Sequence, residues 1–466
     1  MIPETTLAFA GVLHEDTRQH LFPPDGLEAA AILLCARTPE PRRRLLVREA
    51  LFIPHSACGR RERDAITWPG AYLEDALDRA EQDSLALVLI HSHPGGLFAF
   101  SDADDASDRQ VMPSLLHAHG DMHGSAIMTA DGAVRARLYD HAISPRPIDL
   151  VTVAGHDLLY WWEDGARLTG PSRRPVAFTG AMSGELGRLR AAVIGVSGTG
   201  SITAEQLARL GFGGVTLIDF DRLELKNLNR ILNSRIRDAQ DGRLKVEMFA
   251  EAVAAYRAGD VAQPIPASVL TREAILAASQ ADVIFCCVDT LEARQIADLL
   301  ASAFAIPLFD VGVVIPVRQA GDGVAIADVC GRVDYVQPGR STLLDRGVYS
   351  PESLRAEYLR RHAPEAHQQE LEAGYIKGLV EEAPAVITLN MRAASACVNE
   401  FIARAYPFRL EPNRLYARTA FSLAACEEEF TAEDDFPVSE NPVLGRGARE
   451  PLLGLPSLAP RRRGGR

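Results

Sequence analysis

The sequence lacks several features that would assign it to a specialised class. Its 466 residues include seven cysteines, which are scattered and form no CxxC pair. This excludes a four-thiolate structural zinc site and is typical of a protein from a reducing cytoplasm. No apolar run reaches the ~18 residues of a membrane span, and the N-terminus has no basic-then-apolar signal pattern. We therefore expect a cytoplasmic protein without a membrane segment.

Basic residues are also in deficit. The chain has 49 lysines and arginines against 62 aspartates and glutamates, a net charge of −13. Because a general nucleic-acid binder needs a basic face to neutralise phosphates, this balance argues against that class of function. The apolar share of 47% and the charged share of 24% are those of an ordinary globular protein. The length favours two or three domains over a single core.

Residues 189–230 carry the strongest local pattern of the chain. An apolar run that predicts a buried strand is followed by a glycine-rich turn, a helix, and a second apolar run that ends at an acid. The residues are 191–194, then Gly195, Gly198 and Gly200, then 202–210, and finally 215–218 with Asp219. A strand, a glycine turn at a helix N-terminus and a strand-end acid about 20 residues on predict a βαβ unit that binds a nucleotide.

The polar residues that follow this unit favour ATP over a dinucleotide. Asp221 is followed by Asn229-Arg230 and by Lys245. An oxidoreductase has no need for an Asn-Arg block directly after the acidic strand, whereas an enzyme that neutralises a triphosphate does. Asp289 ends a later apolar strand, 282–288. An acid at the carboxyl edge of a parallel sheet can hold Mg²⁺.

These features resemble the ThiF/MoeB family, the adenylating domain of ubiquitin-activating enzymes. The matching segments are GxxGxGS (195–201), LIDFD (217–221), NLNR (227–230), Lys245 and Asp289. The resemblance covers about 185–425 and implies a Rossmann-like, mainly parallel sheet. It also implies that the glycine turn, Asp219 and Asp221 form the nucleotide site, with Asp219 on the ribose. Asn229, Arg230 and Lys245 would bind the phosphates, and Asp289 the magnesium.

A second motif lies in the N-terminal part of the chain. The predicted strand 85–90 runs into His91-Ser92-His93-Pro94, and Ser101-x-x-Asp104 follows at the start of a predicted helix. Residues two apart on a strand point to the same face, so the two histidines can bind one ion together, with Asp104 adding a carboxylate. Two imidazoles and a carboxylate leave one zinc position open for water. Ser101-x-x-Asp104 is also a helix-capping pattern.

This spacing resembles the JAB/JAMM (MPN+) metallopeptidase signature over about residues 1–145. The resemblance implies a zinc peptidase or isopeptidase that acts on ubiquitin-like C-termini, with His91, His93 and Asp104 as zinc ligands. Ser101 would stabilise the oxyanion. The family also requires an upstream glutamate as general base on the zinc-bound water. Glu28 fits that place best, and Glu49 is the alternative.

Together these interpretations predict an α/β chain in four parts. A JAB/MPN-like mixed α/β domain would occupy 1–145, a linker 146–185, and a Rossmann-like adenylating domain 186–425. The acidic, then Pro- and Gly-rich segment 426–466 is expected to be a mostly disordered tail.

The predicted function combines the two motifs. The chain would use ATP and Mg²⁺ to adenylate the C-terminal glycine of a ubiquitin-like or sulfur-carrier protein, and Zn²⁺ to process or deconjugate that protein. Family resemblance also implies a homodimer. Two alternatives stay open at this point: adenylation of a peptide or small carboxylate, and an interaction scaffold with reduced catalytic activity.

The fate of the adenylate is a separate question. Family members that form a thioester carry a cysteine in the segment after the magnesium acid, yet residues 331–396 contain none. Transfer to the thiol of an external acceptor protein is therefore favoured. The alternatives are a thioester on Cys330 and an oxyester on Ser341 or Thr342.

Overall fold

The structure is a computed structural model that describes residues 2–164, 174–320, 323–363 and 386–460. The chain divides into two compact units. The first unit comprises residues 3–174, 302–305 and 442–466, and the second comprises 1–2, 175–301 and 306–441. Neither unit is therefore one continuous stretch of the chain. None of the helices in the described ranges combines the length and apolarity that a membrane-spanning helix requires.

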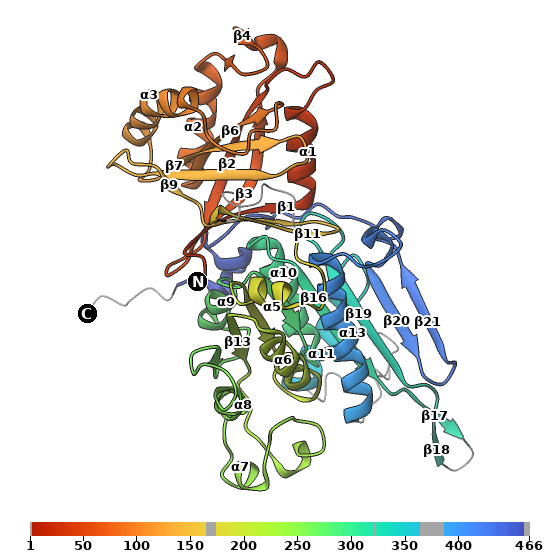
Figure 1. The fold of residues 1–466 in the computed structure, drawn as a ribbon. Helices are drawn as coiled ribbons and strands as arrows, with labels where there is room; N and C mark the ends of the chain where they lie inside the picture. The colour runs from red at the N-terminus through yellow and green to blue at the C-terminus, as the bar shows by residue number, and fades with distance from the viewer. Residues whose placement is uncertain (1, 165–173, 321–322, 364–385, 461–466) are drawn as a thin grey trace. The chain divides into compact units, whose positions relative to one another are not determined.

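The first unit is built on a nine-stranded mixed sheet (Figure 1) in the order β11-β10-β1-β3-β2-β6-β7-β8-β9. Its strands are β1 (Thr5–Ala10), β2 (Ala30–Arg37), β3 (Arg43–Phe52), β6 (Ala86–His93), β7 (His123–Thr129), β8 (Val134–Tyr139), β9 (Arg146–Pro147), β10 (Leu150–Ala154) and β11 (Leu158–Trp162), with a separate hairpin of β4 (Arg60–Arg61) and β5 (Ile66–Thr67). The helices are α1 (Gly11–Leu21), α2 (Ala71–Asp83) and α3 (Asp102–Ala118).

The centre of this sheet follows from its sequence. Strand β2 reads AAILLCAR, and nearly all of its residues are buried. Such a continuous apolar run is typical of a strand that is covered on both faces. Strand β6 begins in the same way but ends in polar residues, HSH, so the sheet brings imidazoles to one end of a buried strand.

The structure differs from the prediction of a linker over 146–185. Strands β9, β10 and β11 lie within that range and belong to the sheet of the first unit. β10 pairs in parallel with β1, from Thr6↔Leu150 to Ala10↔Ala154, and β11 pairs antiparallel with β10. Trp162, at the end of β11, is buried. The first unit therefore extends to residues that local sequence patterns assign to a connection.

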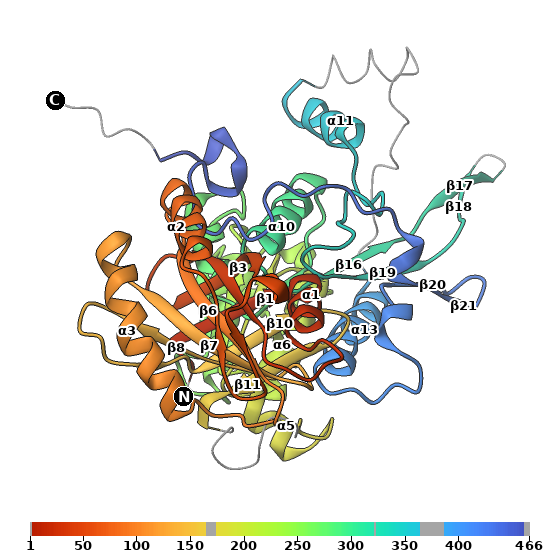
Figure 2. The same ribbon diagram turned by 90° about the horizontal axis from the view of Figure 1, so that it is seen from above.

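The second unit contains an eight-stranded sheet in the order β14-β13-β12-β15-β16-β19-β20-β21, and helix α13 lies beside α6 (Figure 2). Its strands are β12 (Arg190–Ile194), β13 (Gly214–Ile218), β14 (Ala262–Ile265), β15 (Val283–Cys286), β16 (Leu308–Val314), β19 (Cys330–Val336), β20 (Arg418–Ser422) and β21 (Glu427–Thr431), with a separate hairpin of β17 (Val317–Ala320) and β18 (Gly323–Ile326). The helices are α5 (Gly180–Leu186), α6 (Gly198–Leu210), α7 (Ile236–Gln240), α8 (Lys245–Ala254), α9 (Arg272–Ala278), α10 (Leu291–Ala303), α11 (Pro351–His362) and α13 (Ile387–Ala405).

Five of the eight strands of this sheet have the predicted Rossmann-like arrangement. β14, β13, β12, β15 and β16 are all parallel, and β19 to β21 continue the sheet antiparallel. The predicted βαβ unit is present as β12, α6 and β13. From β12 the chain moves to β13 on one side and later to β15 on the other. Ligands of open α/β sheets bind at such a reversal of strand order, outside the carboxyl ends of the strands.

The structure also differs from the prediction of a disordered tail over 426–466. β21 pairs with β20 at the edge of the second sheet, and Glu433, in the short helix η4 (Glu433–Asp435), is almost fully buried. Residues 442–460 belong to the first unit, where the backbone N–H of Ala448 donates to the Arg37 carbonyl at 3.2 Å and Arg449 pairs with Asp83. The last described residues of the chain thus complete both units.

Candidate active sites

In the first unit the predicted metal ligands lie together at the end of β6. His91 Nε2 is 3.1 Å from His93 Nε2 and 3.0 Å from Asp104 Oδ1, and His93 Nε2 is 3.5 Å from Asp104 Oδ2. Strand geometry explains the pair of imidazoles, since residues two apart share a face of the sheet. Asp104 comes from the first turn of α3. Two imidazole nitrogens and a carboxylate therefore converge on one point.

Neighbouring groups fix the orientation of the His93 ring and keep the Asp104 carboxyl group ionised. His93 Nδ1 lies 2.7 Å from the Leu97 carbonyl oxygen. A carbonyl only accepts hydrogen bonds, so Nδ1 carries a proton and Nε2 is the ring nitrogen that faces the cluster, the orientation of metal-ligating histidines. Burial opposes ionisation of Asp104, but hydrogen bonds from His91 and His93 lower the pKa of its carboxyl group well below the usual value. The carboxylate is thus present as the anion that a metal needs.

Ser101 and Asp104 form the capping box that their spacing predicts. The Asp104 N–H donates to Ser101 Oγ at 3.2 Å, and Asp104 Oδ2 accepts from the Ser101 N–H at 2.6 Å and from Ser101 Oγ at 2.8 Å. The capping role and the position beside the histidines occur together. One oxygen of Asp104 is thereby fixed by the cap, while the other faces His91.

Of the two candidate bases, Glu28 lies in the cluster. Strand β2 runs antiparallel to β6 with Ala30 opposite His91, so Glu28 falls opposite His93. Ligand atoms of Glu28, His91 and His93 all lie within 4.8 Å of one another. The carboxyl group of Glu28 is buried, and this burial raises its pKa. Glu49 instead lies on β3 and accepts a hydrogen bond from Arg79 at 2.5 Å.

In the second unit the glycine turn has no room for side chains. Gly195 has φ +85°, which favours glycine, and its N–H donates to Ile218 O at 2.8 Å. A Cβ on Gly200 would lie 1.7 Å from the Gly195 carbonyl oxygen, and a Cβ on Gly198 would lie 2.4 Å from Asn390 Nδ2. The turn is therefore closely packed against the first turn of α6.

Asp219 holds this turn at the end of β13. Its Oδ2 accepts from the Val196 N–H and its Oδ1 from the Asp221 N–H, both at 2.8 Å. Burial raises the pKa of Asp219, while the nearby Lys245 opposes that rise. Both carboxylate oxygens thus accept hydrogen bonds from backbone amides, one in the glycine turn and one just after β13. Its assignment to the ribose stays a prediction.

The predicted phosphate-binding side chains lie near the same edge of the sheet. Lys245, the first residue of α8, is buried and its Nζ is 2.7 Å from Asp221 Oδ2. The Arg230 side chain lies against the turn, with its Cδ 3.2 Å from the place of a Cβ on Gly198. Its guanidinium donates to Asn229 Oδ1 at 3.2 Å. The sequence also places Asp289 three residues beyond β15, where it is exposed.

Sequence reasoning missed Asn390. It lies in the first turn of α13, it is buried, and its Oδ1 accepts from Thr199 Oγ1 at 3.3 Å. α13 is apolar enough to be interpreted as a core helix, which it largely is. The only sequence signal for a second role is one amide residue among apolar neighbours, and that signal is weak.

Comparison with known proteins assigns both units. The model of the ThiF family matches residues 175–402, and the model of prokaryotic homologs of the JAB domain matches residues 12–139. The chain joins a JAB-type domain to a ThiF-family domain. Both resemblances seen in the sequence are thereby confirmed, in the predicted order.

Curated relatives match a limited part of the chain. Ubiquitin-like modifier-activating enzyme 5 of Drosophila pseudoobscura pseudoobscura is 28% identical over 161 residues, and that of Bombyx mori is 27% identical over 161 residues. Each alignment covers 32% of this chain and 37% of the relative. Among solved structures, E. coli MccB with ATP has 16% sequence identity and a TM-score of 0.41, covering 57% of this chain and 68% of that chain.

The ThiF domain contains no obvious activated thiol among its described residues. Cys330 is half-buried at the start of β19, and burial together with the Asp328 carboxylate raises the pKa of its thiol to about 11. Burial also raises the pKa of Cys286 and of Cys397. Since the thiolate is the nucleophile, these environments oppose thioester chemistry.

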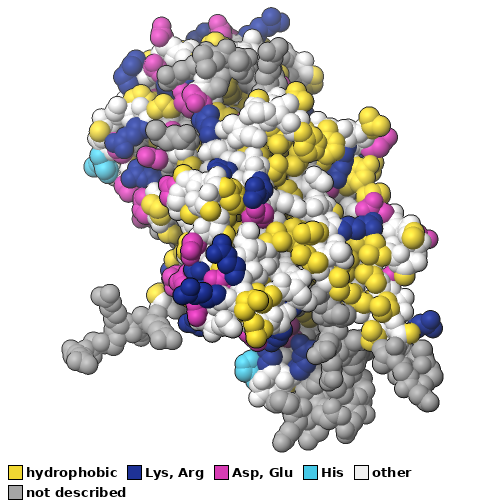
Figure 3. Space-filling view, turned by 60° about the horizontal axis from the view of Figure 1, so that its bottom comes forward, with side chains coloured by type: hydrophobic (Ala, Val, Ile, Leu, Met, Phe, Trp, Pro, Cys, Tyr) yellow, Lys and Arg dark blue, Asp and Glu magenta, His cyan; other side chains and the backbone are white. Residues whose placement is uncertain are grey.

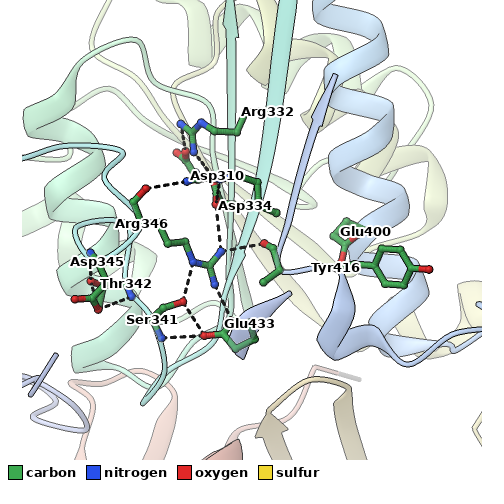
Figure 4. A network of polar contacts seen from close by, with 12 residues as sticks. Asp310, Arg332, Asp334, Ser341, Thr342, Asp345, Arg346, Glu400, Tyr416 and Glu433 are labelled. Carbon is green, nitrogen blue, oxygen red and sulfur yellow. Dashed lines mark hydrogen bonds and ion pairs between the residues drawn. The ribbon is translucent and has the colours of Figure 1, made fainter. Parts of the chain in front are cut away.

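The two candidate hydroxyl groups for an oxyester both donate hydrogen bonds to carboxylates. Ser341 is fully buried, and its Oγ donates to Glu433 Oε1 at 2.7 Å and accepts from Arg346 Nε at 2.9 Å (Figure 4). Thr342 Oγ1 donates to Asp345 Oδ2 at 2.8 Å. The geometry at Ser341 therefore contradicts the oxyester alternative for that residue.

Figure 4 shows that Ser341 belongs to a chain of buried ion pairs in the ThiF domain. Its members alternate in charge: Arg294, Asp310, Arg332, Asp334, Arg346 and Glu433. At one end Arg294 donates to the Val288 carbonyl at 2.6 Å, directly before Asp289. The network thus connects the loop after β15 with the segment around Glu433.

Proposed function

We propose that the ThiF domain adenylates the C-terminal glycine of a ubiquitin-like or sulfur-carrier protein, and that the JAB-type domain is a zinc hydrolase that processes or deconjugates the same protein. The observation that carries this proposal is the convergence of His91, His93, Asp104 and Glu28 in a domain joined to a ThiF domain. Hydrolysis at such a C-terminus and its activation need the same substrate, which supports their union in one chain.

The nucleotide turn fits a triphosphate. Backbone N–H groups at the start of α6, together with the helix dipole, favour an anion there. Arg230 lies against this turn, and Asn229 and Lys245 lie on the segments that follow. Asp289 is an exposed oxygen ligand at the same carboxyl edge, which fits Mg²⁺ because this ion usually takes one or two carboxylates together with substrate phosphates.

In the proposed reaction the glycine carboxylate attacks the α-phosphate of ATP. A carboxylate–phosphorus bond forms, the bond to the bridging oxygen breaks, and pyrophosphate leaves with the electron pair. Arg230 and Lys245 would stabilise the negative charge that develops on the phosphate oxygens, which is the main catalytic contribution in such transfers. The preorganised turn would hold the nucleotide in place without rearrangement.

The residues of the JAB-type domain fit zinc. The Nε2 atoms of His91 and His93 and the ionised carboxylate of Asp104 are the nitrogen and oxygen donors that zinc prefers, and three such ligands are typical of a catalytic site. Bound there, zinc would supply a Lewis acid and lower the pKa of a water molecule. Glu28 would take a proton from that water and pass it to the leaving group, a role that its raised pKa suits. Ser101 would stabilise the oxyanion.

We further propose that the adenylate passes to the thiol of an external acceptor protein. The raised pKa of Cys330 and the buried, doubly bonded hydroxyl of Ser341 support this choice over transfer within the chain. A cytoplasmic location and a homodimer complete the proposal. The free cysteines of the described structure support the cytoplasmic location. The resemblance to ThiF-family enzymes supports the homodimer.

ATP–pyrophosphate exchange tests the adenylating half. We expect exchange that depends on a ubiquitin-like or sulfur-carrier protein ending in glycine, and loss of at least 10²-fold in Lys245→Ala and in Arg230→Ala. Arg209→Ala is the matched control, because Arg209 lies exposed on α6, where it forms an ion pair with Glu205 and lies over the Tyr256 ring. Failure of every glycine-terminated protein to support exchange would disprove this half of the proposal. Exchange with a peptide or small carboxylate instead would favour that alternative substrate.

Metal content tests the hydrolytic half. Purified protein should hold about one zinc per chain, and His91→Ala should lose both the zinc and the cleavage of a glycine-extended substrate. His117→Ala, which changes an exposed histidine of α3, should retain both. If His91→Ala keeps zinc and cleavage, the metal assignment is wrong.

A further inference from the structure

The segment that carries the proposed metal ligand Asp104, a loop and the first turns of α3, is attached to strand β8 through two arginines. Arg135 and Arg137 lie two apart on β8 and therefore share a face of the sheet. Neither belongs to the His-x-His or Ser-x-x-Asp spacing. Both reach the segment between His93 and Asp108, which contains the loop and the first turns of α3.

Arg137 makes the larger set of contacts. Its Nη2 and Nε donate to Asp108 Oδ2 at 2.6 Å and 2.9 Å, and its Nη1 donates to Asp105 Oδ1 at 2.5 Å. Its Cζ lies 3.8 Å from the centre of the Phe100 ring, a cation–π geometry. The guanidinium therefore touches the residue before Ser101 and the residue after Asp104, so it brackets the capping box on both sides.

The anchor of this arrangement is buried. The side chains of Arg137 and Asp108 are 8% and 9% exposed, and Asp108 Oδ2 also accepts from Ser125 Oγ and from Tyr139 Oη at 2.8 Å. Asp108 lies four residues after Asp104 on α3, so the two carboxylates share a face of the helix. Fixing Asp108 against β7 and β8 therefore fixes the rotation and height of the helix turn that presents Asp104.

Arg135 holds the preceding part of the loop. Its Nη1 donates to the Phe98 carbonyl at 3.2 Å. Its Nε and Nη2 form a bidentate ion pair with the Glu163 carboxylate at 2.8 Å and 2.6 Å. The next carbonyl back along the loop, that of Leu97, is the one that orients His93. Arg135 thus stabilises the segment that sets the His93 ring.

We propose that Arg137, assisted by Arg135, is the positioning residue that sets the distance between Asp104 and the two histidines and thereby the affinity and geometry of the metal site. This inference rests on the proposed zinc site. The planar guanidinium is essential to it, because one group must meet Asp108, Asp105 and the Phe100 ring at once, and an ammonium has no such fork.

The test is titration of metal-free full-length protein with Zn²⁺ against a chromophoric competitor, together with the visible spectrum of the Co²⁺-loaded protein. We expect Arg137→Lys to bind zinc at least tenfold more weakly, the loss typical of residues that orient metal ligands. We also expect its Co²⁺ bands to shift, since these bands report ligand geometry. Arg146→Lys is the control, because Arg146 lies in the same domain and pairs at the surface with Asp140.

Two further variants keep the test valid if Arg137→Lys folds poorly. Asp105→Asn removes only a half-exposed contact and should weaken zinc binding severalfold, whereas Asp102→Asn removes the same charge from the same helix turn without touching Arg137 and should weaken it less. Arg137→Met with Asp108→Asn removes both buried charges and leaves an amide oxygen that can accept from Ser125 and Tyr139, and it should also lose affinity.

The outcomes separate this inference from the proposed function. Unchanged zinc affinity and Co²⁺ spectra in every variant that keeps the wild-type melting transition would overturn the role of Arg137 alone. Wild-type protein that binds no zinc would overturn the proposed hydrolase, and this role with it. Weaker zinc binding in Asp105→Asn than in Asp102→Asn, with an unchanged melting transition, supports a positioning role over a merely structural one.

Discussion

The carboxyl group of Asp298, on α10 of the ThiF domain, is buried in an environment that disfavours its charge. Its Oδ2 accepts from Tyr349 Oη at 2.8 Å and from the Leu344 N–H at 3.4 Å. Burial outweighs these hydrogen bonds and raises the pKa of Asp298 to about 6. An aspartate of the unfolded chain ionises near pH 4. Between these two values the folded domain therefore holds a proton that the unfolded chain has lost.

This difference predicts a pH dependence of stability. The contribution of Asp298 is complete below about pH 4 and is lost as the pH rises through about 6, because the folded state binds more protons in that window. We expect the free energy of unfolding of the ThiF domain to fall by roughly 1 kcal/mol from this group between pH 5 and pH 7. Urea unfolding at both pH values should show a smaller drop in Asp298→Asn than in wild type. The same drop in Asp298→Asn as in the exposed control Asp260→Asn would contradict the assignment.

Glu28 and Glu49 can be separated by one pair of variants. Glu28→Gln keeps the size and polarity of a buried side chain but cannot take a proton, so we expect zinc to remain while the cleavage rate falls by 10²- to 10⁴-fold. Glu49→Gln breaks only the surface pair with Arg79 and should retain cleavage within about twofold. Rates measured at equal zinc content give the comparison. Equal loss in both variants would contradict Glu28 as the base.

At the scale of elements, the buried ion pairs of the ThiF domain predict a strong effect on stability from Glu433, which belongs to neither proposed active site. The guanidinium of Arg346 is fully buried and pairs with Glu433 at 2.9 Å and Asp334 at 3.2 Å. Glu433→Ala would leave this charge only partly compensated, which typically costs about 3–5 kcal/mol. Glu429→Ala, on the exposed strand β21, should cost less than about 1 kcal/mol. Denaturant unfolding measures both.

The elements that could be predicted from the sequence are those encoded by local spacing. β12, α6 and β13 follow from an apolar run, a glycine turn and an acid within some thirty residues, and the pair His91 and His93 follows from the two-residue period of a strand. Asp104 follows from its capping pattern. In each case the information lies inside one supersecondary unit.

The elements that could not be predicted depend on partners far along the chain. β10 and β11 are five residues each, and their place in the sheet is decided by pairing with β1 near the N-terminus. In the sequence Glu433 is one acid of an acidic run. In the fold, its contact with Arg346 distinguishes it from the other acids of that run. Arg137 and Asn390 belong to the same group, since their contacts lie on other elements.

At the scale of the whole molecule, one face of the surface carries both signs of charge (Figure 3). On the face shown in Figure 3, basic and acidic side chains lie beside one another, and hydrophobic side chains gather between them. The exposed aromatic residues Phe178, Phe408 and Phe430 all belong to the ThiF domain.

The discontinuous units lead to a prediction on truncation. Deleting 442–466 removes the contacts that join this segment to Arg37 and Asp83 of the JAB-type domain, but leaves Glu433 in the ThiF domain. We expect the JAB-type domain to lose on the order of 1–3 kcal/mol of stability, or several degrees in melting temperature, while pyrophosphate exchange is retained. If the truncated protein loses pyrophosphate exchange as well as the stability of the JAB-type domain, this division of the chain is contradicted.

The same discontinuity bears on the order in which the protein can fold during synthesis. Domains usually fold as they leave the ribosome, the N-terminal one first. Here residues 3–174 leave the ribosome long before residues 442–460, although both segments belong to the same unit. The segment 427–441 likewise completes the ThiF domain long after its first strands have been made. The nascent chain must therefore carry two unfinished domains at once until the segments 427–441 and 442–460 have been made.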